Sequence, residues 1–246
     1  ANFAKFLMNV SFTSVDNSFY QDLFDLLERS TVRPSYITRS VISALRHHPA
    51  FSSMVEATVS SQQDSKIPYR DIAEQLSRIP LLLKLLKLSP VFDIEIEQAL
   101  TVLRRAMIEA TIAGKTDEMS LPFSTALTLH CFVNEYVFAE TEEEKEAVEK
   151  LETQIATLLE NSQTVPPSFV VALGAYRPLF RFSWAKALSK GKWEEDIRSV
   201  IKRQITEPLE ERSLRDQIGQ ITAVQNSISQ SVRDQYEENP YPRWVT

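Results

Sequence analysis

The sequence predicts an all-α fold of antiparallel helical hairpins, arranged as an irregular bundle or as a short superhelix like that of tetratricopeptide repeats. Apolar residues recur at intervals of three and four along most of the 246 residues. No stretch alternates apolar and polar residues for long enough to predict a half-buried strand. The hydrophobic share of 43% is that of a globular chain, which at this length can bury a sizeable core.

The N-terminal part is expected to form short helices, each with apolar residues on one face. These faces are Phe19, Leu23, Leu26 and Leu27, then Ile37, Val41, Ile42 and Leu45, and then Met54, Val55 and Val59. The polar stretch 60–66 follows them and is the best linker in the chain. We therefore predict an N-terminal helical segment over residues 1–66 and a main helical domain over 67–235.

The clearest helix of the main domain begins after Asp93, a suitable N-cap, and stops near Gly114. Apolar residues line one of its faces, namely Ile96, Leu100, Leu103, Met107 and Ala110. The next helix is expected over residues 121–139, because Pro122 is tolerated in a first turn and the apolar run continues to its end.

Thr141 and Glu144 have the spacing of a capping box, which predicts that a helix starts there. The acidic run 142–146 is interpreted as a solvated first turn favoured by the helix dipole, with a binding patch as the alternative. Further helices are expected after Pro167, over 197–205 and over 221–232. Pro208 is expected to end or kink the second of these.

Several classes of site are disfavoured by composition. The four glycines are dispersed and form no phosphate-binding loop, and the net charge of −6 argues against nucleic acid as a partner. No apolar stretch reaches the length of about 20 residues that a membrane helix needs. Cys131 has no disulfide partner within the chain, so we expect a buried, inert thiol and a cytoplasmic location. The neighbours His47 and His48, like His130 and Cys131, lack the spacing of metal ligands.

Two regions carry open alternatives. Asn134, Glu135 and Tyr136 interrupt the apolar run 126–138 with hydrogen-bonding side chains. They form either an internal network that fixes helix packing or a polar contact to a partner. The aromatic residues of 166–193, including Trp184 and Trp193, form either core packing or a peptide-binding groove.

Three segments carry a family resemblance. Residues 236–244 read YEENPYPRW, residues 131–144 read CFVNEYVFAETEEE and residues 90–97 read PVFDIEIE. Together they resemble the helical region that precedes the catalytic domain in bacterial tetratricopeptide-fused methyltransferases that use S-adenosylmethionine. Similar segments occur in the rickettsial protein-lysine methyltransferases.

The resemblance implies a non-catalytic chain that binds no cofactor itself, whereas a downstream catalytic domain of the parent protein binds S-adenosylmethionine. The expected partners are that domain, a protein substrate and further copies of the chain. Residues 236–246 are expected to be an extended docking segment, because Pro240 and Pro242 cannot continue a helix. The candidate docking residues are Tyr236, Asn239, Tyr241, Arg243 and Trp244, together with Asn134, Glu135 and Tyr136. The alternative function is a free-standing helical scaffold for protein interaction.

Overall fold

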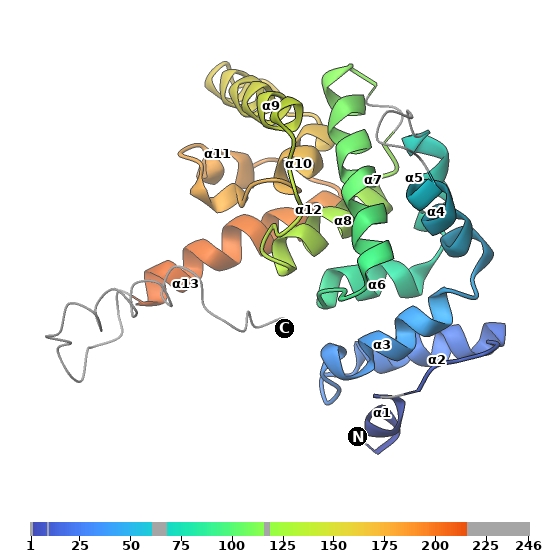
Figure 1. Cartoon of the computed structure of the whole chain (residues 1–246). Coiled ribbons are helices and arrows are strands. Elements are labelled where there is room, and N and C mark those ends of the chain that lie inside the picture. The colour runs from blue at the N-terminus through green and yellow to red at the C-terminus, as the bar shows by residue number, and fades with distance from the viewer. Residues whose placement is uncertain (1, 9, 61–67, 116–118, 216–246) are drawn as a thin grey trace, which may run out of the picture.

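The all-α prediction is confirmed. A computed structural model of the chain describes residues 2–8, 10–60, 68–115 and 119–215, and their arrangement is shown in Figure 1. Every regular element among these residues is a helix, and none of them forms a strand. The helix expected over 221–232 lies outside the described residues.

The N-terminal helices are α1 (Asn2–Leu7), α2 (Asn17–Glu28), α3 (Pro34–Leu45) and α4 (Pro49–Ser60). The last three coincide with the helices that the sequence predicts, and their expected apolar faces are buried at Leu23, Ile37 and Met54. Helix α1 packs on α3, while α2 and α3 pack on α6, and α4 packs on α7. One hydrophobic cluster therefore includes residues from both predicted segments. The boundary between them falls at residues that the structure does not describe.

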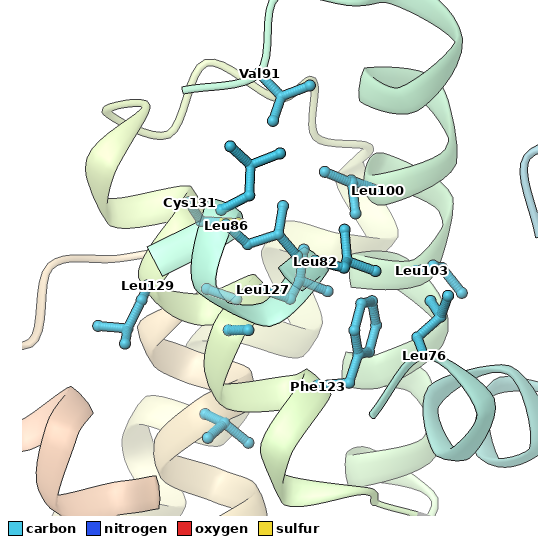
Figure 2. Packing of buried hydrophobic residues seen from close by; sticks show 14 of the residues in the cluster. Leu76, Leu82, Leu86, Val91, Leu100, Leu103, Phe123, Leu127, Leu129 and Cys131 are labelled. Carbon is cyan, nitrogen blue, oxygen red and sulfur yellow. The ribbon is translucent and has the colours of Figure 1, made fainter. Parts of the chain in front are cut away.

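Helix α8 (Leu121–Val133) is the centre of the bundle. It is surrounded by α5 (Tyr69–Ser77), α6 (Pro80–Leu88), α7 (Ile94–Ile112), α10 (Pro167–Gly174) and α12 (Glu195–Ile201). Its side chains are buried on every side from Phe123 to Val133, as expected of a helix enclosed by others. Figure 2 shows Phe123, Leu127 and Cys131 of α8 among leucines of α6 and α7. This part of the molecule is an irregular bundle.

The signals at the two ends of α7 are confirmed. The Asp93 carboxylate accepts a hydrogen bond from the backbone N–H of Ile96 at 3.2 Å, which caps the first turn. After the helix, Gly114 adopts a φ of 74°, a conformation that glycine reaches without steric cost. The predicted apolar face is buried, and Figure 2 shows Leu100 and Leu103 directed into the cluster.

The C-terminal half contains α9 (Glu142–Glu160), α10, a 3₁₀ turn η2 (Leu179–Arg181), α11 (Ala185–Ser189) and α12. A π-helical segment η3 (Lys202–Thr206) then leads into α13 (Glu207–Arg215). Of the two alternatives for Pro208, the one in which it ends the helix is wrong, because α13 continues through Pro208, while the α-helical winding is interrupted directly before it by the π-helical segment. Proline lacks an N–H and crowds the carbonyl four residues earlier. In the wider π turn the N–H of Glu207 bonds to the carbonyl of Lys202 instead, so the helix accommodates the ring.

Gln204, within the π-helical segment, ties three helices together. Its buried side-chain amide donates to the carbonyl of Gly174 at 2.9 Å and to that of Thr128 at 3.4 Å, and its oxygen accepts from the N–H of Leu179 at 3.4 Å. A Cβ at Gly174 would lie 2.9 Å from the Thr128 methyl group, so only glycine permits this approach of α10 to α8. None of the described helices is both long and apolar enough to cross a lipid bilayer.

Candidate functional site

The connection between α8 and α9, residues 134–141, is the most unusual backbone in the described chain, and we call it the α8–α9 loop. The prediction that the helix runs to residue 139 is wrong, because α8 ends at Val133. The Asn134 N–H still bonds to the His130 carbonyl at 2.9 Å, and the Tyr136 N–H reaches back to the Cys131 carbonyl at 2.9 Å. Glu135 and Tyr136 have φ values of 58° and 59°, which places both in the left-handed region and reverses the chain.

Two consecutive left-handed residues that are not glycine are costly. Each such residue is disfavoured by about 1–3 kcal/mol, and it persists only where the surroundings hold it in place. A glycine at either position would remove this penalty, and a helix-terminating glycine was the stop signal that the sequence lacked. The loop must therefore be fixed by its contacts.

The first half of the loop is fixed by contacts to α8 and α10. In the amide orientation that satisfies its neighbours, Asn134 donates to the carbonyls of His130 and Cys131 at 3.2 Å and 2.8 Å. The Tyr136 hydroxyl donates to the carbonyl of Gly174 at 3.3 Å. Asn134 and Tyr136 therefore take part in an internal network, and Glu135 between them is exposed.

The second half of the loop is fixed by α7 and by the segment after α10. Phe138 is buried, and the Arg104 guanidinium donates to the Ala139 carbonyl at 2.6 Å. Arg177 binds the Glu140 carboxylate through two hydrogen bonds of 2.5 Å and 2.9 Å, and these raise the pKa of Arg177. Val137 alone in this half leaves a large apolar surface in water, with 66% of it exposed.

A buried cluster of Arg104, Glu144 and Tyr176 lies beneath the loop. The Tyr176 hydroxyl donates to Glu144 at 2.6 Å, and the Tyr176 ring lies 4.1 Å from the Arg104 guanidinium. Arg104 and Glu144 form an ion pair at 3.5 Å and are almost inaccessible to solvent. Burial raises the pKa of Tyr176 well above its usual value. The cluster therefore combines a buried cation, a buried anion and a hydroxyl group that donates to the anion.

Glu144 corrects the interpretation of the acidic run 142–146 as solvated. The capping box is confirmed, with the Thr141 N–H donating to Glu144 at 2.9 Å and the Glu144 N–H donating to the Thr141 hydroxyl at 3.3 Å. The same carboxylate, however, points inward to Arg104. Sequence reasoning missed Arg104 as well, although its four-residue spacing from Leu100 and Ile108, both buried, placed it on the core face of α7.

The loop that precedes α7 lies beside the α8–α9 loop. His130 lies between them, because the backbone of Leu86 and Ser89 is close enough to act on the pKa of its imidazole and its ring lies 5.9 Å from that of Phe138. Phe92 and Ile94 expose 88% and 66% of their surface there. The end of α6, directly before the segment 90–97, and Phe138 in the segment 131–144 thus both lie against His130.

His130 makes folding sensitive to pH. Burial lowers the pKa of His130 to about 4, and its hydrogen bonds to backbone oppose the shift only in part. Below pH of about 6.5 the unfolded chain takes up a proton that the folded chain refuses until about pH 4. The free energy of unfolding should therefore fall as the pH falls through this window, with about 2 kcal/mol lost by pH 5.

Urea unfolding from pH 7.5 to pH 5 measures this contribution. The His130→Gln variant should show a smaller loss of stability over the same range, because glutamine does not titrate. The comparison uses the change in the free energy of unfolding with pH, so the stability of the variant at any single pH does not affect it. Equal slopes for the two proteins would contradict the prediction.

No group of three or more His, Cys, Asp or Glu side chains in the described residues is placed to hold a metal ion. Cys131 is confirmed as a free, buried cysteine, and burial raises the pKa of its thiol to about 12. His47 Nε2 lies 2.8 Å from the Phe12 carbonyl oxygen, a contact that joins the end of α3 to the segment before α2. The surroundings of Cys131 and His47 are therefore those of residues with a structural role.

The docking residues Tyr236, Asn239, Tyr241, Arg243 and Trp244 lie outside the described residues, so their role stays a prediction. Comparisons with models of protein families, with curated proteins and with solved structures found no match for the chain. The resemblance to methyltransferase-associated helical regions therefore also stays a prediction.

Proposed function

We propose that this chain is the non-catalytic helical region of a bacterial protein methyltransferase that uses S-adenosylmethionine. In this proposal the chain holds the catalytic domain and recruits the protein substrate. The observation that supports it most is the α8–α9 loop, in which contacts on both sides of Val137 fix a strained backbone while Glu135 and Val137 stay exposed.

The construction of the loop suits a docking contact. Backbone strain of this kind is found at functional sites, where the surrounding structure holds it. A contact that is rigid before binding loses little conformational entropy when its partner arrives. Val137, Phe92 and Ile94 offer apolar surface, and the centres of protein interfaces are depleted of charge. The neighbouring loops therefore support a surface on which another domain packs.

The remaining parts of the proposal follow from the resemblance. The downstream catalytic domain would bind S-adenosylmethionine, and residues 236–246 would pack against that domain. Self-association of the helical region is a further binding role that the resemblance implies.

Methyl transfer by the full-length product of the gene tests the proposal. Val137→Asp should lower the activity about tenfold or more, because a charge replaces an apolar contact at an interface, while the melting temperature stays unchanged. Phe6→Asp is the matched control, since Phe6 on α1 is exposed to a similar extent, 68% against 66% for Val137. Tyr241→Ala and Trp244→Ala should also weaken activity without lowering the melting temperature.

Two outcomes would contradict the proposal. A coding sequence downstream of Thr246 without a glycine-rich strand–turn–helix would favour the free-standing scaffold instead. Unchanged activity in Val137→Asp, Tyr241→Ala and Trp244→Ala would show that neither the loop nor the segment 236–246 docks on a catalytic domain.

A further inference from the structure

The longest stretch of this acidic chain without any carboxylate lies in its C-terminal half. No Asp or Glu occurs over residues 161–193, in a chain whose net charge is −6. The second half of this stretch carries cations and aromatic residues on η2, α11 and the turn that follows, beside the π-helical segment (Figure 1). We call these residues the basic aromatic surface, and they are Arg181, Phe182, Trp184, Lys186, Lys190 and Lys192.

The four cations of this surface have no counter-charge in the part of the chain that the structure describes. Arg181, Lys186, Lys190 and Lys192 are exposed and form no ion pair there. By contrast, nearby cations are paired, as Arg177 is with Glu140 and Arg198 with Glu195. Lys186 lies on α11 and Lys190 follows its last residue in a helical backbone conformation, so the two lysines, four residues apart, share one side of this turn, while Ala185 and Leu188 are buried.

Two aromatic rings lie directly before these lysines. Phe182 and Trp184 stack with centroids 4.5 Å apart and an angle of 5° between their planes, and both remain half-exposed. The Trp193 indole donates to the Leu188 carbonyl at 3.0 Å, whereas the Trp184 indole has no hydrogen-bond partner among the described residues. Ammonium, guanidinium and indole groups only donate hydrogen bonds. The surface therefore offers donors and an apolar platform to a partner rich in acceptors.

We propose that the basic aromatic surface binds an acidic segment of a protein, with carboxylates on the lysines and an apolar side chain on the Phe182–Trp184 pair. This inference deepens the substrate-recruiting part of the proposed function and rests on it. A partner of opposite charge is also guided to the surface during diffusion, in a manner that salt weakens.

The observations favour a peptide over a nucleic acid. Phe182 and Trp184 stack on each other, so a base cannot insert between them. Helix α9 packs on α10, immediately before the surface, and exposes Glu142, Glu143 and Glu146. A nucleic acid carries a charge at every phosphate and, where it extends past the cations, meets this acidic helix. A short acidic segment of a protein, by contrast, can bind within the basic aromatic surface without extending to α9.

Binding of fluorescent peptide probes to the chain of residues 1–246 tests the proposal. The first probe is a glutamate-rich peptide with one central phenylalanine, and the second has lysine at each glutamate position. The acidic probe should bind, more weakly as salt is added, and the basic probe should not. Joint Lys186→Glu and Lys190→Glu replacement should weaken the acidic probe about tenfold or more.

The matched control reverses two other exposed cations, Arg39→Glu and Arg70→Glu, which make the same change in net charge on α3 and α5 and should leave affinity within about twofold. Trp184→Phe keeps the stacked pair and removes the indole donor, so it should weaken binding without changing the melting temperature. Equal weakening in the control would show an effect of net charge alone and would overturn the site.

Absence of binding by the acidic probe, or tighter binding of oligothymidylate or of anionic lipid vesicles, would also overturn the proposal. So would binding that follows self-association of the chain in sedimentation. None of these results involves methyl transfer, so each would leave the docking role of the α8–α9 loop to its own assay.

Discussion

Replacement of Glu144 by leucine should lower the free energy of unfolding by about 3–5 kcal/mol, the range found when one member of a buried ion pair is removed. Arg104 would remain as a buried charge without its 3.5 Å partner. The Tyr176 hydroxyl and the Thr141 N–H would also lose their acceptor. Urea unfolding followed by circular dichroism measures the change. Glu146→Leu, two residues along the same helix and exposed, should shift stability by no more than about 0.5 kcal/mol.

A double-mutant cycle separates the ion pair from the other contacts of Glu144. Addition of Arg104→Met to Glu144→Leu removes both buried charges, so the double variant should be less destabilised than the sum of the single variants. Strict additivity would mean that Arg104 and Glu144 do not interact, and Glu144 would then be held by the capping box, by Tyr176 and by the Arg105 guanidinium at 3.4 Å.

Leu103→Asp should lower the free energy of unfolding at least as much as Glu144→Leu does, by about 4 kcal/mol or more. Leu103 is fully buried on α7, and Figure 2 places it beside Leu76 in the hydrophobic cluster. The substitution removes apolar contacts and introduces a carboxylate at a position that provides no cation to pair with it. Ile96→Asp, on the same face, should behave alike.

Thermal melts and the yield of folded protein measure the effect of Leu103→Asp. Gln154→Asp is the matched control, because it introduces the same side chain at an exposed position in the middle of α9, and Glu146→Ala should be nearly silent. Equal melting temperatures for Leu103→Asp and Gln154→Asp would mean that the assigned face of α7 is wrong.

Features encoded by neighbouring residues could be predicted from the sequence. The start of α7 at Asp93 and the start of α9 at Thr141 each depend on a side chain that bonds to backbone within three residues. The buried face of α7 follows from its spacing alone. The fold class and these helix boundaries were therefore accessible from local signals.

Features that depend on distant residues could not be predicted in this way. The end of α8 lacks a glycine, and the loop that contains its two left-handed residues is held by Gly174, Arg104 and Arg177 from other elements. The burial of Glu144 depends on Arg104 in the preceding long helix. In the candidate site, Asn134, Glu135 and Tyr136 were noticed because they interrupt an apolar run, whereas the cluster beneath them was not.

The π-helical segment before α13 has a consequence for the evolution of this region. A single inserted residue in an α-helix can be absorbed as a π turn, and each residue turns the helix by about 100°. Loss of one residue within 202–206 would restore regular winding and leave the helix content almost unchanged. It would also rotate α13 relative to α12 and carry Arg212 away from the Phe180 ring, from which it now lies 4.7 Å. Length changes here therefore redirect one face of α13 without unfolding it.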